Sequence, residues 1–271
     1  MSGNPWRLID TGFSNGYINM AIDEVLMLSC KRNGARPTLR FYQWKPSALS
    51  IGYSQRFGEG FNVENCRSMG VDIVRRLTGG QAVFHDGDLT YSVTIPETYL
   101  QAPRTEILIK MISLGLKQGL NNLGIEVNLI NSGRSELNKK SYNCFLNKSN
   151  YEIGINGKKL VGSAQRRTSG ALLQHGAIMI KIDYNRILKV FGENGESDKE
   201  NIFKIGEKIT SLSENMEMAP NVEEIKKAII SGFEKAIGIS LVFEPLSAEE
   251  LYYIEKLTDE KYSKEEWNEK Q

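Results

Sequence analysis

Two arginines, two glycines and a histidine fall within one twelve-residue segment of the sequence. The segment reads Arg75-Arg76-Leu77-Thr78-Gly79-Gly80-Gln81-Ala82-Val83-Phe84-His85-Asp86. Paired glycines let backbone N–H groups approach a ligand closely because no Cβ stands in the way, and the neighbouring arginines could hold a carboxylate or a phosphate. A plain hairpin turn between two strands explains the same glycines. The segment alone therefore leaves both interpretations open.

A second segment places a lysine near the start of an expected strand. Asn156-Gly157 is a strong signal for a two-residue hairpin turn, so Lys159 should lie on the strand that leaves this turn. A lysine in that position is normally a solvated edge residue. Further on, His175 lies in a Gln-His-Gly stretch of another expected strand. There a hydrogen-bonded core histidine is as good an interpretation as a site residue.

The three cysteines differ in their surroundings. Cys30 closes an amphipathic helix and Cys66 lies in another helical turn, so both suit the inert, hydrophobic role of most lone cysteines. Cys144 lies in a polar, lysine-bearing stretch, where a nearby cation would lower the thiol pKa and favour the thiolate. Such a thiolate could act as a nucleophile without a histidine partner. Disulfides are not expected, because the cysteines are odd in number and widely spaced, and a zinc site is not expected because only two histidines exist to complete it.

Short runs of β-branched and aromatic residues between turn residues predict the strands. These runs are Thr38–Tyr42, Ala48–Gly52, Asp72–Arg76, Ala82–His85, Thr90–Thr94, Tyr151–Ile155 and Leu172–Ile180. Their connections are too short for crossover helices, so many pairs should be antiparallel. Amphipathic spacing and capping residues predict helices over Asn19–Ser29, Thr105–Leu123 and Val222–Ile237, and a last one behind Ser247. Because strands and helices occur in blocks, the sequence predicts an α+β fold with helices on a mostly antiparallel sheet.

Two long polar stretches interrupt this plan, Asn131–Asn150 and Gly192–Asn215. Long connections inside a compact domain commonly carry function, and a solvated surface loop fits the second stretch better than the first. Between Arg134 and Arg167 there are eight Lys/Arg residues and two acidic ones. This basic region could attract an acidic partner.

Composition narrows the function classes. The 271 residues carry 34 Lys+Arg and 33 Asp+Glu, for a formal net charge of +1. A general nucleic-acid binder would show a clear basic excess, so no nucleic-acid partner is expected. No apolar run approaches the roughly 20 residues of a membrane span, and the start of the chain lacks the apolar stretch of a signal peptide. We therefore expect a cytoplasmic protein without a membrane partner.

Taken together, these segments resemble the biotin/lipoate protein ligase and transferase family. Its ligase branch reads Arg-Arg-x-(Ser/Thr)-Gly-Gly-Gly-x-Val-x-His-Asp, which Arg75 to Asp86 match except that Gln81 replaces the third glycine. Gly157 to Gln165 is similar to the family's lysine segment, Gly-x-Lys-x-x-Gly-Ser-Ala-Gln, which assigns Lys159 as the family lysine. The resemblance covers nearly the whole chain and is closest to the octanoyltransferase branch of the family.

The resemblance implies a biotin/lipoate ligase-like catalytic domain of mostly antiparallel sheets with flanking helices. Residues 1–271 would form a single acyltransferase domain, with roughly the last 30 residues as a C-terminal helical extension. Cys144 would accept an octanoyl group from octanoyl-acyl carrier protein as a thioester, and Lys159 would lower the pKa of the Cys144 thiol. The acyl group would pass to the lysine of a lipoyl-domain protein, such as the glycine cleavage H protein.

The resemblance also implies a set of substrate-binding residues. These are Arg75, Arg76, Thr78, Gly79, Gly80, His85, Gly162, Ser163, Ala164 and His175. Because a thioester donor is already activated, no ATP, other cofactor or metal is expected.

Three other functions compete with this interpretation. An amidotransferase that moves octanoyl between lipoyl domains would use the same cysteine, so only competition between donors would distinguish it. A lipoate–protein ligase would need ATP, and Gln81 argues mildly against it because the replaced glycine helps to cradle the adenylate in that branch. A non-catalytic binding module would be unaffected by Cys144→Ala.

Overall fold

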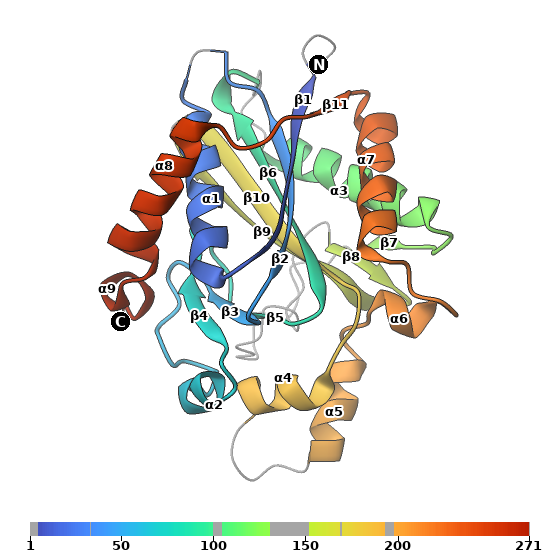
Figure 1. The fold of residues 1–271 in the computed structure, drawn as a ribbon. Helices are drawn as coiled ribbons and strands as arrows, with labels where there is room; N and C mark the ends of the chain where they lie inside the picture. Colours follow the sequence, from blue (N-terminus) through green and yellow to red (C-terminus); the bar gives the residue numbers. More distant parts are fainter. Residues whose placement is uncertain are drawn as a thin grey trace.

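This computed structural model describes residues 5–32, 34–99, 105–130, 152–168, 170–192 and 198–270. Its largest element is an eight-stranded mixed sheet (Figure 1). Its strand order is β11 (Leu241–Phe243), β1 (Trp6–Ser14), β2 (Thr38–Trp44), β6 (Asp88–Pro96), β10 (Ala171–Met179), β9 (Lys158–Thr168), β8 (Glu152–Ile155) and β7 (Asn128–Ile130). The pairs from β2 to β7 are antiparallel, as predicted. β1 pairs in parallel with both of its neighbours. The α+β fold class predicted from the sequence is confirmed.

A smaller three-stranded sheet overturns the hairpin interpretation of the two glycines. Strand β3 (Ala48–Ile51) lies between β4 (Asp72–Arg75), which runs parallel to it, and β5 (Val83–His85), which runs antiparallel. Residues 76–82, which we call the glycine loop, therefore cross from one side of β3 to the other. Gly52 follows β3 and makes room for this crossing, because a Cβ at Gly52 would lie 1.8 Å from the carbonyl oxygen of Gly80.

The four predicted helices are present. They are α1 (Gly16–Ser29), α3 (Thr105–Asn122), α7 (Val222–Ile237) and α8 (Ala248–Leu257). Asn221 and Ser247 form the predicted capping boxes at the starts of α7 and α8, and Gly238 ends α7 in the left-handed conformation with φ of 71°. Helices α3 and α7 pack closely, since a Cβ at Gly232 would lie 2.2 Å from the backbone nitrogen of Gly119.

The expectation of a solvated loop over Gly192–Asn215 is wrong for its described part. That part holds α5 (Asp198–Gly206) and α6 (Leu212–Asn215), and it follows α4 (Tyr184–Phe191). Ile205, Ile209 and Leu212 are buried in the main core. These apolar residues are sparse among lysines, glutamates and asparagines, and their burial outweighs the polar composition of the stretch.

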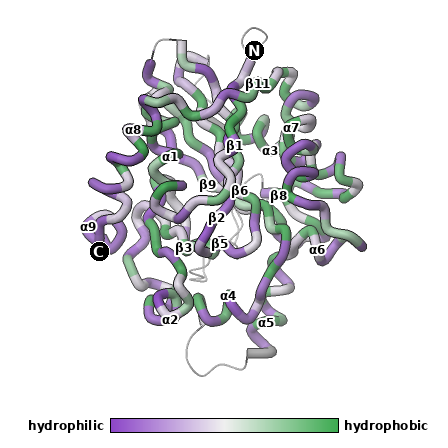
Figure 2. The backbone as a smooth tube through the Cα atoms, in the orientation of Figure 1, coloured by the Kyte–Doolittle hydropathy of each residue, from purple (hydrophilic) through white to green (hydrophobic). Residues whose placement is uncertain are grey.

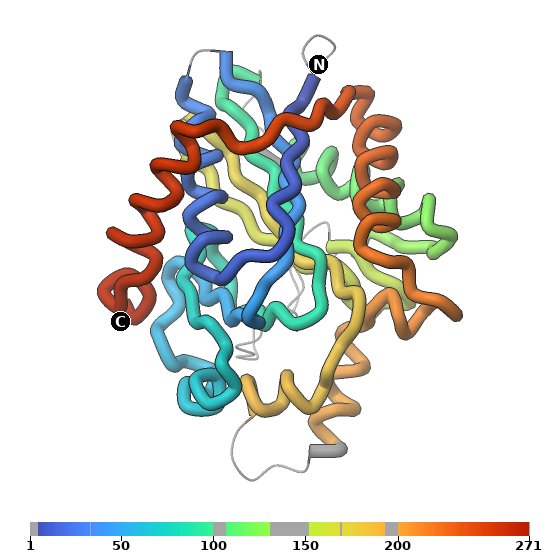
Figure 3. The backbone as a smooth tube through the Cα atoms, in the orientation of Figure 1, coloured from blue at the N-terminus to red at the C-terminus, as the bar shows by residue number. Residues whose placement is uncertain are grey.

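The C-terminal chain links distant parts of the molecule. Figure 3 shows it running from α7 across the sheet to α8 on the opposite side. It continues through a helical turn (Thr258–Tyr262) to α9 (Glu265–Asn268), which contacts β4. Glu269, directly after α9, accepts from Arg67 of α2 (Val63–Ser68) at 3.2 Å. Hydrophilic residues predominate around α9 (Figure 2). None of the described helices is long and apolar enough to cross a membrane.

A buried ion pair ties α1 to the large sheet. The Asp23 carboxylate on α1 accepts from Arg40 Nη1 at 2.7 Å and from Ser92 Oγ at 2.8 Å through one oxygen. Its other oxygen accepts from the Tyr42 hydroxyl at 3.1 Å and contacts His175 Nδ1 at 2.9 Å. Arg40, Ser92 and His175 are register partners on the adjacent strands β2, β6 and β10. One carboxylate therefore binds three neighbouring strands.

Replacement of Arg40 by methionine should destabilise the fold strongly. Arg40 is fully buried, and its loss would leave the Asp23 charge buried without its main partner, at a cost of about 3–5 kcal/mol in free energy of unfolding. Arg32→Met is the matched control, because Arg32 is 49% exposed in its pair with Glu249 and such a pair contributes about 0–1 kcal/mol. Urea denaturation at pH 7 measures both, and equal losses would contradict this account.

Candidate active site

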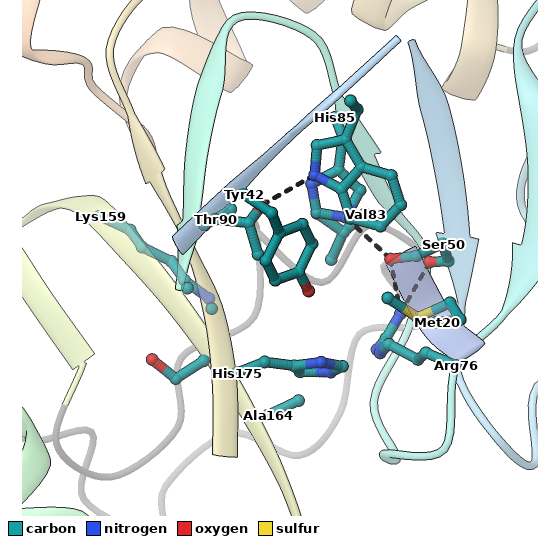
Figure 4. A pocket seen from close by; sticks show the side chains of 15 residues that line it. Met20, Tyr42, Ser50, Arg76, Val83, His85, Thr90, Lys159, Ala164 and His175 are labelled. Carbon is teal, nitrogen blue, oxygen red and sulfur yellow. Dashed lines mark hydrogen bonds between the residues drawn. The ribbon is translucent and has the colours of Figure 1, made fainter. Parts of the chain in front are cut away.

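A pocket opens between the large sheet and the small one (Figure 4), with about 410 Å³ of empty space when the open solvent at its mouth is included. Its lining residues are Met20, Tyr42, Trp44, Ser50, Arg76, Val83, His85, Thr90, Lys159, Gly162, Ser163, Ala164, His175, Gly176 and Ala177. The mixture of apolar walls with a few polar groups is typical of small-molecule sites. The structure thus brings together seven of the sequence-predicted site residues.

The other predicted residues have different positions. Thr78, Gly79 and Gly80 belong to the glycine loop but are not part of the lining. Arg75 is buried, and its guanidinium donates to six main-chain carbonyls, three after β3 and three in the C-terminal chain. Cys144 lies outside the described residues, as does the whole of Asn131–Asn150.

Lys159 reaches the pocket through an irregularity in β9. The turn at Asn156-Gly157 is present, with φ of 50° and 80° at its two residues, as the sequence predicts. The pairing of β8 with β9 shifts register between Ile153 and Gly154, which leaves Leu160 as an extra residue on β9. Leu160 and Val161 both join the core, while Lys159 lines the pocket. Bulges of this kind redirect a side chain beside a site.

Lys159 is not the solvated edge residue that its position would normally suggest. It is only 1% exposed, and its Nζ donates to Glu152 Oε1 at 2.7 Å. Both side chains are buried, and of the two only Lys159 lines the pocket. A charged pair in such surroundings is held firmly, because breaking it would leave a buried charge without its partner.

Two carboxylate-oriented histidines face the pocket. His175 Nδ1 contacts Asp23 at 2.9 Å, and its Nε2 contacts Thr78 Oγ1 at 2.7 Å. His85 repeats the arrangement, with Nδ1 at 3.1 Å from Asp88 and Nε2 at 2.9 Å from Ser50 Oγ. The simplest assignment is that each Nδ1 carries a proton donated to its carboxylate, and each Nε2 accepts from a hydroxyl.

Arg76 joins the two histidine arrangements. Its Nε donates to Thr78 Oγ1 at 3.1 Å, and its Nη1 donates to the Ser50 carbonyl at 2.7 Å. Its Nη2 donates to the carbonyls of Gly79 and Gln81, both at 2.8 Å. Figure 4 shows Lys159 on one side of the pocket and Arg76 with Ser50 on the other. Arg76 therefore turns the carbonyls of the glycine loop toward itself, while the exposed backbone of Gly79 remains accessible.

Burial and charge set the protonation of this network. Burial is the main reason that the His175 pKa lies below its usual range, and the Arg76 charge adds to that effect against the pull of Asp23. Burial alone would raise the pKa of the Asp23 carboxyl, but the Arg40 charge and hydrogen bonds from His175 and Ser92 bring it below its ordinary value. Asp23 therefore stays ionised and His175 neutral near pH 7.

Sequence reasoning missed several members of this network. Asp23 lies on a predicted amphipathic helix, where one acidic residue looks like any solvent-facing position. Ser50 is a single polar residue in a short apolar strand, and this was its only sequence signal. Asp88 lies three residues after His85, a spacing that acquires meaning only once the turn between β5 and β6 brings the two together.

The family model described as the lipoyl protein ligase A/B catalytic domain matches residues 15–234. The chain therefore belongs to this family. It is 38% identical over 270 residues to "Octanoyltransferase LipM" of Clostridioides difficile (strain 630), covering 98% of this chain and 99% of that relative. It is 35% identical over 275 residues to "Octanoyltransferase LipM" of Bacillus subtilis (strain 168), covering 99% of each. These relatives define the chain as an acyltransferase enzyme.

Solved structures agree on the fold. A lipoate-protein ligase A bound with ATP superimposes with a TM-score of 0.81 at 24% identity, covering 98% of this chain and 99% of that one. A bi-partite lipoate protein ligase from Thermoplasma acidophilum gives a TM-score of 0.81 at 24% identity, covering 98% and 97%. The biotin/lipoate ligase-like architecture predicted from the sequence is thereby confirmed.

Replacing His175 with asparagine should remove a pH dependence of stability. The pKa of His175 is lowered in the folded state. Below about pH 6.5 the imidazole is therefore protonated in the unfolded chain while it stays neutral in the folded one. Wild-type stability should therefore fall on acidification from pH 7 to 5, by up to about 1.4 kcal/mol per pH unit from this group. Urea titrations at several pH values compare the two proteins, and identical pH slopes would refute the assignment.

A methyl group at Gly52 should displace the glycine loop. The new Cβ would meet the Gly80 carbonyl oxygen at 1.8 Å, so Gly52→Ala should cost about 1–3 kcal/mol in free energy of unfolding. Gly79→Ala is the control for stability, because nothing lies within 4 Å of a Cβ there. If both variants unfold at the same urea concentration, the contact between Gly52 and Gly80 does not constrain the loop.

Proposed function

We propose that the chain transfers an octanoyl group from octanoyl-acyl carrier protein to the lysine of a lipoyl-domain protein during protein lipoylation, through a thioester on Cys144. The glycine cleavage H protein is the expected acceptor. The observation that carries the proposal is the buried Lys159 at the wall of a largely apolar pocket. The names of the relatives, octanoyltransferases similar to this chain over nearly their full length, support the same conclusion.

The proposed reaction has two steps, acylation of Cys144 and transfer of the acyl group to the acceptor lysine. The Cys144 thiolate attacks the donor thioester, the bond between acyl carbon and carrier sulfur breaks, and the carrier leaves as a thiol after taking up a proton. The ε-amine of the acceptor lysine then attacks the new thioester, forms the amide, loses a proton and releases Cys144. Because both large partners use the site in turn, ping-pong kinetics are expected.

Each site residue predicted from the sequence has a role in this proposal. The cation of Lys159 favours the Cys144 thiolate, and the apolar walls receive the acyl chain. The N–H groups of Gly79 and Gly80 stabilise the oxyanion of the tetrahedral intermediates, with Thr78 and Arg76 fixing the loop. His85, His175 and the β9 residues Gly162, Ser163 and Ala164 shape the pocket, and Arg75 acts from outside it.

The whole chain is proposed to act as one acyltransferase domain with a C-terminal helical extension. The family model ends at residue 234, and α8 beyond it packs on α1, which carries Asp23. No cofactor takes part in the proposed reaction. The basic region around Lys159 would attract acidic acyl carrier and lipoyl proteins.

Transfer assays without ATP test this function. Octanoyl-acyl carrier protein should label a lipoyl-domain acceptor without ATP, and Cys144→Ala should abolish the labelling. Labelling only from an octanoylated H protein would favour the amidotransferase instead. Activity that requires octanoate with ATP would favour a ligase, and labelling that survives in Cys144→Ala would reject the nucleophile.

Iodoacetamide labelling should report the effect of Lys159 on Cys144. Burial raises the pKa of the Cys30 thiol to about 12 and that of the Cys66 thiol to about 11, so labelling near pH 7 should occur at Cys144. Lys159→Ala should raise the Cys144 pKa and move the pH–rate profile to higher pH. Peptide mass spectrometry measures labelling at each cysteine. An unchanged profile would exclude Lys159 from this role.

A further inference from the structure

Cations and aromatic rings gather near the end of β9. The Arg166 guanidinium lies over the Tyr53 ring, 4.2 Å from its centre, and the Lys270 ammonium lies 5.5 Å from the same centre. Lys270 also lies 4.1 Å from the centre of the Trp267 ring, which meets the Tyr53 ring edge to face at 6.0 Å. We call Tyr53, Arg166, Trp267 and Lys270 the Tyr53 cluster.

The Tyr53 cluster borders the pocket. Ala164 lines the pocket, and Arg166 lies two residues further along the same strand, about 7 Å on. Arg166 Nη1 donates to the carbonyl of Leu77 at 2.8 Å, and the backbone N–H of Tyr53 donates to the carbonyl of Thr78 at 2.9 Å. Both contacts are with the glycine loop, so the cluster adjoins the loop at the edge of the site.

Arg75 fixes the two halves of the cluster relative to each other. Its Nη1 donates to the carbonyl of Tyr53 at 3.2 Å, and its Nη2 donates to the carbonyl of Lys270 at 3.0 Å. Its own backbone N–H donates to Asn268 Oδ1 at 2.8 Å, and its backbone carbonyl accepts from Trp267 Nε1 at 3.0 Å. A fully buried arginine thus joins the loop after β3 to the C-terminal chain.

The cluster presents positive charge that is not neutralised locally. Lys261 also lies against Trp267, but it is paired with Glu24 at 2.6 Å. Within the described ranges, Arg166 and Lys270 have no carboxylate partner at ion-pair distance. Tyr53 is 37% exposed, and a hydrogen bond from Arg166, together with its charge, lowers the pKa of the Tyr53 hydroxyl. The guanidinium of Arg166, the ammonium of Lys270 and the hydroxyl of Tyr53 are hydrogen-bond donors of the types that anions accept from.

We propose that the Tyr53 cluster binds the phosphate of a phosphopantetheine thioester donor, an inference that rests on the proposed acyl transfer. Guanidinium, ammonium and phenol donors together suit a phosphate group. In such a donor the phosphate lies at the opposite end of the pantetheine arm from the sulfur. Lys159 is seven residues before Arg166 on β9, about 20 Å away, so an arm with its sulfur near Lys159 would extend along β9 toward the cluster.

Two donors that differ only in the phosphate test this site. With the full chain, KM and kcat for acylation are measured for octanoyl-phosphopantetheine and octanoyl-pantetheine. Lys270→Met should raise KM for the phosphorylated donor about fivefold to tenfold, since a charge-assisted contact is lost. KM for octanoyl-pantetheine and kcat for both donors should not change. Arg166→Met should act in the same direction, and Lys264→Met, which removes an exposed lysine of the same tail outside the cluster, should change neither KM.

Two further donors identify the natural source of the phosphate. If Lys270→Met raises KM for octanoyl-acyl carrier protein as it does for octanoyl-phosphopantetheine, the arm of the carrier protein occupies the site. If, of these two further donors, only octanoyl-coenzyme A shows the rise in KM, the coenzyme occupies it. Equal KM values for the phosphorylated and unphosphorylated donors in the wild type would overturn the proposal. So would an effect of Lys270→Met on the carrier protein alone, which would mean that the cluster contacts the carrier's protein surface. If no thioester acylates the wild type, the proposed function itself fails.

Discussion

The buried Asp23 carboxylate is the constraint on which the site depends. It accepts or orients groups from β2, β6 and β10 at once, and Arg40 supplies the charge that makes its burial tolerable. Because Arg40, Ser92 and His175 are partners in register, the carboxylate holds a row that runs across the sheet. Two residues further along each strand, and so on the same face of the sheet, Tyr42, Thr90, Ala177 and Gly162 form a row that lines the pocket. The same interaction that fixes α1 therefore fixes the pocket wall.

The row that contains His175 also fixes the position of the glycine loop. His175 contacts Thr78, Arg76 holds Thr78 and the loop carbonyls, and Ser50 connects Arg76 to His85. The loop is thus positioned by side chains of both sheets, and its accessible glycine backbone is already arranged before a substrate binds. In the proposed mechanism this matters, because preorganised N–H groups stabilise developing negative charge more effectively than groups that must reorient during the reaction.

Local signals in the sequence were sufficient for much of this fold. Capping residues located α7 and α8, and the Asn156-Gly157 turn placed Lys159 on its strand. The burial of Lys159 could not be predicted, because it follows from a bulge at Leu160 and a partner at Glu152. Likewise, Gly79 and Gly80 resemble a hairpin turn until β3 is seen to lie between the strands on either side. Non-local pairing decides such cases, and neither propensity nor spacing reports it.

The central claim is that a cysteine of this chain carries the acyl group between two partners. The most direct measurement is the intact mass of the purified protein after mixing with octanoyl-acyl carrier protein, with neither ATP nor acceptor present. The account predicts one octanoyl adduct that maps to Cys144, is removed by hydroxylamine and is absent from Cys144→Ser. An unmodified protein that nevertheless transfers octanoyl once the acceptor is added would contradict it.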